Sequence, residues 1–67
     1  MIRVYAADHN PPHFHIVTPD AEALIRIENL EVLRGEVPAK VQTAALEWAT
    51  ANIDAIAAEW SRLNKKR

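Results

Sequence analysis

The stretch that decides the fold is residues 8–15, which read Asp8-His9-Asn10-Pro11-Pro12-His13-Phe14-His15. Neither proline can donate a backbone hydrogen bond to a sheet, and the first holds Asn10 in an extended conformation, so residues 8–12 are predicted to form a loop. An alternating pattern resumes at residue 13, with Phe14 and Ile16 on one face and His13 and His15 on the other. Residues 13–17 are therefore predicted to form a strand with one apolar face and one histidine face.

Further short strands are expected on both sides of this segment. Residues 2–6 alternate apolar and polar side chains, which is the pattern of a half-buried strand. Residues 18–21 contain a proline at a position that a type I turn accepts. Two more strands are predicted at 23–27 and 31–33, joined at Asn29, a residue that tolerates left-handed geometry. The first half of the chain is therefore predicted to be a three- or four-stranded antiparallel meander.

The second half predicts one long helix packed on one face of the sheet. Pro38 suits a first helical turn, and neither Gly nor Pro interrupts residues 39–64. At ~100° per residue the apolar positions fill an arc of about 200°, which is wider than a sheet requires. One stripe, which includes Trp48, is predicted to face the core; the other is a predicted partner-binding seam formed by Leu46, Ile53 and Trp60. Asn52 lies inside the arc, as a candidate for a kink or a polar contact.

Length and composition predict a single α+β domain, with the meander in 1–36 and the helix and a basic tip in 37–67. The chain has 67 residues, 9 acidic against 8 basic side chains, and no cysteine. Disulfides, iron–sulfur clusters, cysteine-ligated zinc and a thiol nucleophile are thereby excluded. A net charge of −1 excludes nucleic-acid binding by bulk charge alone. The chain shows neither an apolar run of ~20 residues nor a signal-peptide pattern, so the cytoplasm is the expected compartment.

The histidine loop is where the sequence places a functional site. The alternation leaves polar side chains on the sheet face opposite the core, where we expect them to be open to solvent. His9, His13, His15 and Tyr5 are the candidate catalytic residues, and Arg3 and Arg26 are the candidate phosphate-binding residues.

Three roles fit this set of residues. His13 and His15 point the same way on a strand and, with His9, are candidate ligands of zinc or another divalent metal, although no cofactor is predicted. Two imidazoles beside an arginine also suit metal-independent acid–base chemistry on a phosphodiester. A structural role is the third: histidines beside a double proline often donate to loop carbonyls and stiffen the turn.

The string DHNPPHFH at residues 8–15 resembles the signature of a small bacterial family, the domain of unknown function 4160. The resemblance continues through the Leu30–Gly35 segment and the Leu46-Glu47-Trp48 and Glu59-Trp60 elements, over nearly the whole chain. It implies a protein encoded beside a second small protein, in an arrangement like a type II toxin–antitoxin pair. By that analogy the three histidines are the active residues. Relatives often have a histidine in mid-helix, where this chain has Asn52.

These observations predict a toxin-like protein that cuts or binds RNA through its histidine face, with a ribonuclease-like activity as the candidate chemistry. A small antitoxin-like protein, or a second copy of the chain, is the expected partner. A non-catalytic protein-binding or regulatory module is the alternative, and a metal-dependent hydrolase is the third reading.

Overall fold

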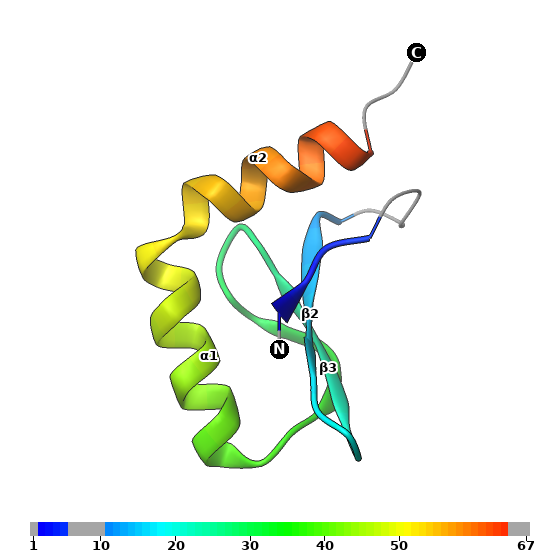
Figure 1. Cartoon of the computed structure of the whole chain (residues 1–67), viewed down its shortest axis with the longest axis vertical. Coiled ribbons are helices and arrows are strands. Elements are labelled where there is room, and N and C mark those ends of the chain that lie inside the picture. The colour runs from blue at the N-terminus through cyan, green and yellow to red at the C-terminus, as the bar shows by residue number, and fades with distance from the viewer. Residues whose placement is uncertain (1, 6–10, 65–67) are drawn as a thin grey trace.

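The chain folds as an antiparallel sheet followed by two helices (Figure 1). The structure, a computed structural model, describes residues 2–5 and 11–64. The elements are β1 (Ile2–Arg3), β2 (His13–Val17), β3 (Glu22–Arg26), β4 (Val32–Glu36), α1 (Ala39–Ala51) and α2 (Ile53–Leu63). The strands lie in the order β1-β2-β3-β4 and every neighbouring pair is antiparallel. The α+β class and the four-stranded meander are as the sequence predicts.

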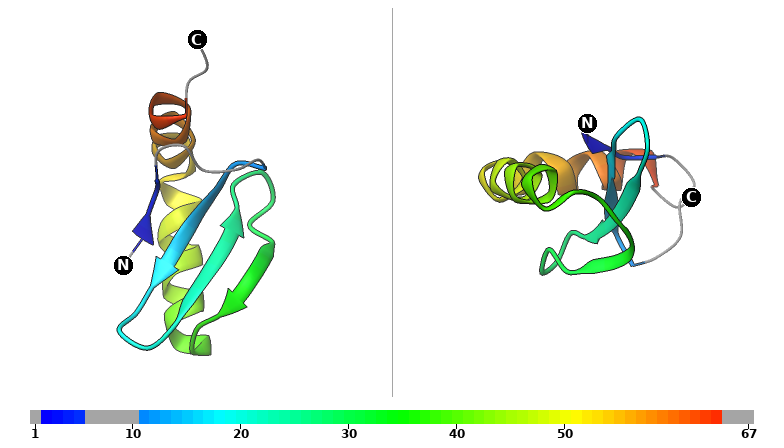
Figure 2. Two further views of the ribbon diagram at one scale, coloured as in Figure 1. Left: turned by 90° about the vertical axis from the view of Figure 1, so that its right-hand side faces the viewer. Right: turned by 90° about the horizontal axis from the view of Figure 1, so that it is seen from below.

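One face of the sheet carries the hydrophobic core, and α1 lies along it (Figure 2). Phe14, Ile16 and Ile25 are fully buried there, as the alternation of β2 predicts. Phe14 pairs with Ile25 across the two central strands, so their side chains share that face. From α1, Ala49 is buried, and its lack of a long side chain lets the helix approach the sheet closely. Neither helix in the described part of the chain has the length and hydrophobicity needed to cross a membrane.

The prediction of one long C-terminal helix is wrong, because the helical segment breaks at Asn52. The Asn52 backbone leaves helical geometry, with φ −123° and ψ 21°. Its backbone N–H is shared between the carbonyls of Trp48 and Ala49, both at 3.1 Å, and its side-chain amide donates to the Trp48 carbonyl at 2.9 Å. An asparagine side chain that competes for backbone groups in this way ends a helix more readily than it continues one. The residue identified as a candidate kink is thus a full helix boundary.

After this break, α2 turns across the end of the sheet where β2 begins (Figure 1). Ile56 and Trp60 are its buried residues. At its far end the Asn64 side chain donates to the Tyr5 carbonyl at 3.0 Å, which ties the end of the helix to the chain after β1. The two helices therefore cover different parts of the sheet.

The β3–β4 connection differs in detail from the prediction. Asn29 accepts a hydrogen bond from the Glu31 N–H through its side chain at 3.0 Å, while Leu30 is the residue with a left-handed backbone, at φ 61°. In β4, Gly35 has φ 77° and lies opposite Ala23. A Cβ atom at Gly35 would lie 2.2 Å from the Glu22 carbonyl oxygen. The only glycine of the chain is therefore required both by its backbone conformation and by the close approach of β3.

We therefore expect Gly35→Ala to destabilise the fold by about 1–3 kcal/mol, because the new methyl group forces β4 away from β3 and strains the backbone. The measurement is the free energy of unfolding in urea. Ala44→Gly, at an exposed helical position, is the control and costs about 1 kcal/mol through helix propensity alone. A Gly35→Ala protein as stable as the parent contradicts this account of the sheet.

Candidate functional site

The sheet register brings the predicted site residues together on the face opposite the core. Arg3 pairs with His15 across β1 and β2, and His13 pairs with Arg26 across β2 and β3. Directly opposed residues of antiparallel strands share a face, and so do residues two apart on one strand. Arg3, His13, His15 and Arg26 therefore lie on one side of the sheet, as the alternation predicts.

His13 is enclosed by the second helix. It is only 5% exposed, and its ring lies 5.1 Å from the Trp60 ring of α2 and 5.2 Å from the His15 ring, measured between centroids. Its Nδ1–H donates to the Pro11 carbonyl at 2.8 Å. The side chain thus closes the proline loop onto β2 and provides a surface on which Trp60 packs.

His15 forms an imidazole–carboxylate pair with Glu22. Its Nδ1 lies 2.6 Å from a Glu22 carboxylate oxygen, and the Tyr5 ring contacts it edge-on at 4.5 Å. With Nδ1–H donating to the carboxylate, the neutral ring carries its basic lone pair on Nε2. The His15 side chain is 11% exposed and the Glu22 side chain 47% exposed, so the pair lies at the boundary between interior and solvent.

The expectation that both imidazoles are open to solvent is wrong, because Trp60 covers His13, while Tyr5 and Glu22 pack against His15. His13, with its ring held by a main-chain carbonyl, fits the structural role that the sequence left open. His9, the third predicted catalytic or metal-binding residue, lies outside the described residues. Among residues 2–5 and 11–64 no group of three or more His, Asp or Glu side chains is placed to hold a metal ion.

The two candidate phosphate-binding arginines differ in their surroundings. Arg3 is exposed at the sheet edge, whereas Arg26 is half-buried. Within the described part of the chain the buried Nε of Arg26 has no hydrogen-bond partner. Arg26 lines a cavity of about 320 Å³ under α2, whose other lining residues are Pro11, Pro12, Ile27, Glu28, Ala57 and Ser61. Since the Nε is buried and Glu28 places a carboxylate on the same wall, the cavity itself does not favour an anion.

A surface ion pair between Glu59 and Arg62 shifts the pKa of both groups. Arg62 donates to both carboxylate oxygens of Glu59, at 3.1 and 2.7 Å. These hydrogen bonds lower the pKa of the Glu59 carboxyl and raise the pKa of the Arg62 guanidinium. Since solvent screens this pair, it contributes little to stability. It marks a solvated side of α2.

The two tryptophans exchange the roles that the helical pattern predicts for them. Trp60, assigned to the partner-binding seam, is only 7% exposed and packs on His13. Leu46 and Ile53, the other seam residues, are half-buried and pack against the core. Trp48, predicted to lie in the core, is 52% exposed. The break at Asn52 causes this difference, because the predicted faces assume one unbroken helix axis.

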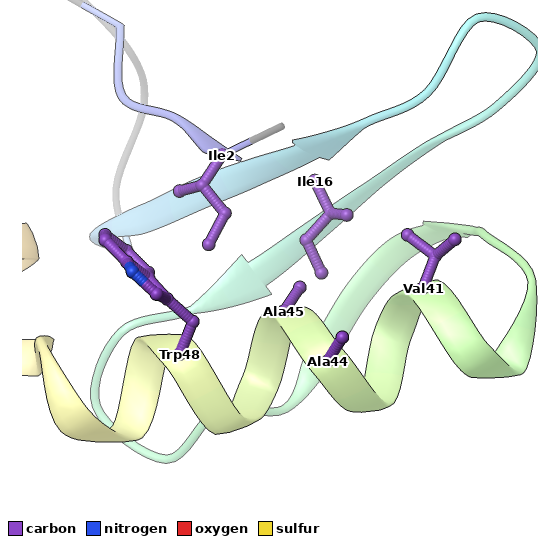
Figure 3. Close-up of a pocket in the computed structure, with 6 residues that line it drawn as sticks. All are labelled: Ile2, Ile16, Val41, Ala44, Ala45 and Trp48. Atoms are coloured by element: carbon purple, nitrogen blue, oxygen red, sulfur yellow. The ribbon is translucent and has the colours of Figure 1, made fainter.

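Trp48 borders an apolar groove between α1 and the β1 edge of the sheet (Figure 3). The cavity has a volume of about 500 Å³. We call it the Trp48 groove; its lining residues are Ile2, Ile16, Val41, Ala44, Ala45 and Trp48. In Figure 3 the indole closes one end of the groove and Val41 lies toward the other. A second hollow of about 280 Å³, bordered by Val4, Ile56 and Glu59, continues past Trp48.

Sequence reasoning missed two of these features. Glu22 was not among the candidate site residues, although the turn predicted at residues 18–21 sets Val17 opposite Glu22 and so places Glu22 diagonally beside His15. That register was available from the sequence. The exposure of Trp48 was not, because it follows from the direction that α2 takes after Asn52.

The fold and the site together define a class: a small two-layer α+β protein in which one histidine of the central β2 strand is enclosed by the second helix and the next pairs with a carboxylate. Within that class, the chain belongs to the family described as Domain of unknown function (DUF4160), whose model matches residues 1–61. No curated protein and no solved structure matches the chain in these comparisons. The family resemblance noted from the DHNPPHFH string is thus confirmed.

If His13 is structural, its removal must cost stability. We expect His13→Ala to lower the free energy of unfolding by about 2–4 kcal/mol, because it leaves a cavity under Trp60 and removes the hydrogen-bond donor of the Pro11 carbonyl. Urea unfolding measures the change. Arg3→Ala, an exposed substitution on the same face, is the control and should change stability by less than about 0.5 kcal/mol. Equal stability of the two variants would remove the structural role.

Proposed function

We propose that this protein is a protein-binding module and that the Trp48 groove is its binding surface. The observation that carries the proposal is the exposure of Trp48, at 52%, beside a cavity whose other described walls are aliphatic. Burial of an indole removes a large apolar area from water, so an exposed tryptophan leaves much hydrophobic stabilisation unused. Tryptophan beside an apolar pocket is also the residue type most often found at the energetic centre of protein interfaces.

The chemistry of the groove supports a protein as the ligand. Its six lining residues include no charged side chain, and the indole Nε1–H is the single side-chain polar group among them. An apolar cavity with one donor suits bulky aliphatic or aromatic side chains from another chain better than it suits a phosphate or a sugar. Small domains also gain stability from a partner, because they bury a limited fraction of their own surface.

The family resemblance implies a biological setting for this activity. In a toxin–antitoxin-like pair of a bacterial cytoplasm, one small protein restrains the other by direct contact. The Trp48 groove is a surface on which such restraint can act without touching the histidine pair. The neighbouring gene's product is then the first candidate partner of a different sequence.

The test compares Trp48, which lies on α1 beside the β1 edge of the sheet, with Leu33, an exposed apolar residue of the opposite edge strand β4. We expect Trp48→Asp to weaken binding to a protein partner by roughly thirtyfold or more, since it places a carboxylate in the centre of the interface. Leu33→Asp, which alters a residue of β4 that is 37% exposed, should leave binding unchanged.

Binding is measured by titration calorimetry with the co-expressed neighbouring gene product, and by sedimentation for self-association. Loss of either association in Trp48→Asp alone supports the proposal. If the wild type binds no protein by either measurement, or Trp48→Asp binds as the wild type does, the proposal fails.

A second candidate function is acid–base chemistry on RNA, and the His15–Glu22 pair is what favours it. A carboxylate that accepts the Nδ1–H of an imidazole fixes the ring and leaves Nε2 as the basic atom, with the Tyr5 ring beside it. Arg3 and Arg26 flank the two histidines on the same face and are suited to hold a phosphodiester. This arrangement needs no metal ion, and it would give the toxin-like activity its chemistry.

For this second candidate, Glu22→Gln is the informative variant, because it keeps the shape of the side chain and removes its charge. We expect it to slow RNA cleavage by about 10²-fold or more. The assay is cleavage of a labelled RNA by the purified protein in a chelator. Arg34→Ala, an exposed change on the same sheet face, is the control. Undetectable cleavage by the wild type, or equal rates for wild type and Glu22→Gln, rejects ribonuclease activity at this site.

A further inference from the structure

We propose that the occupant of the Trp48 groove is a second copy of this chain, bound across a two-fold axis with the two α1 helices antiparallel. The inference rests on the proposed function, because it takes the groove to be a protein-binding surface and names the partner. Its basis is that the parts of a self-complementary interface lie together on one side of α1.

The first part is a matched projection and cavity. Trp48 closes one end of the groove, and the cavity of about 500 Å³ lies directly beside it over Ala44 and Ala45 (Figure 3). In a two-fold dimer the same patch meets itself, so each copy must carry both the projecting group and the space that receives it. Pairing centred between Thr43 and Ala44 sets Trp48 of each copy opposite the first turn of the other copy's α1, at the Val41 end of its groove. The two indoles then close the two ends of one shared apolar interface.

The second part is a charge pattern that places opposite charges against each other only when the two α1 helices are antiparallel. Lys40 and Glu47 are both exposed on α1 and are seven residues apart, which returns them to the same side of the helix. Ala44 lies between them on that side and permits close approach. With the helices antiparallel about this position, each Lys40 faces Glu47 of the second copy, and two equivalent ion pairs form. Parallel helices would instead set like charges against each other.

The charges of Lys40 and Glu47 have no ionic partner in the part of the chain that the structure describes. Three small exposed residues, Thr43, Ala44 and Ala51, lie beside Lys40 and Glu47 on the same side of α1. A partner of unrelated sequence has no reason to match this spacing, whereas a second copy matches it by symmetry. The pattern therefore favours self-association over a foreign occupant.

The test is a charge-reversal experiment read by sedimentation equilibrium at low salt, where surface ion pairs are least screened. The wild type should be a dimer in exchange with monomer, and Trp48→Asp should be monomeric. Lys40→Glu and Glu47→Lys, each alone, should weaken the dimer about tenfold, because two pairs are lost and two repulsions are introduced. Arg34→Glu, an equal charge reversal on β4, is the control and should leave the dimer unchanged.

The decisive measurement is the mixture of the two weakened variants. When Lys40→Glu is mixed with Glu47→Lys, the heterodimer pairs opposite charges at both contacts. One contact joins the unchanged Glu47 and Lys40, and the other joins the two introduced charges. Association in the mixture should return to the wild-type strength or better. A monomeric wild type, a dimer insensitive to either reversal, or a mixture that stays dissociated overturns the inference.

These outcomes are separable from those of the proposed function. If the wild type is monomeric but binds the neighbouring gene product, and Trp48→Asp abolishes that binding, the groove remains a protein-binding surface and the second copy is rejected as its occupant. If Trp48→Asp alters neither association, both the inference and the proposed function fail.

Discussion

The arrangement of this molecule depends on how the chain ends its first helix at Asn52. The Trp48 carbonyl accepts from both the backbone N–H and the side-chain amide of Asn52. The backbone leaves helical geometry there, and the Asn52 carbonyl then accepts from the Ile56 N–H as α2 begins. An unbroken helix would run straight along one face of the sheet. The break allows α1 to cover that face and α2 to cross the end of the sheet.

Two consequences of the break determine what the protein can do. The first is that Trp60 reaches His13, so the histidine strand becomes an internal wall on which the second helix packs. His13 and His15 each use Nδ1 in a hydrogen bond within the chain, to Pro11 and to Glu22. The histidine motif is thus explained in large part by the packing of a small protein, in which a buried polar group needs a partner to be tolerated.

The second consequence is that no helix or strand of the described residues covers Trp48, which is 52% exposed. It lies on α1 before the break, and α2 leads away from α1 across the end of the sheet where β2 begins (Figure 1). The groove beside it is bordered by apolar groups that α2 does not cover. A binding surface next to the core is thus a result of the same local event that buries His13.

Much of the fold could be predicted from the sequence, and the residues show why the rest could not. The period-2 pattern of β2 identified the core face with Phe14 and Ile16, and the double proline located the start of β2, because both effects are local. The face shared by the histidines and arginines followed from the same alternation. The burial of His13 did not, because it depends on Trp60, which is far along the chain. The positive φ at Leu30, beside the expected Asn29, also reflects packing rather than local preference.

The central claim is that the break at Asn52 buries Trp60 and leaves Trp48 at the surface, and tryptophan fluorescence tests it most directly. Two single-tryptophan variants, Trp60→Phe and Trp48→Phe, each isolate one indole, and acrylamide quenching at high dilution measures its accessibility. The account predicts strong quenching and red-shifted emission from Trp48, and weak quenching with blue-shifted emission from Trp60. Equal quenching of the two, or a shielded Trp48 in the dilute monomer, would contradict it.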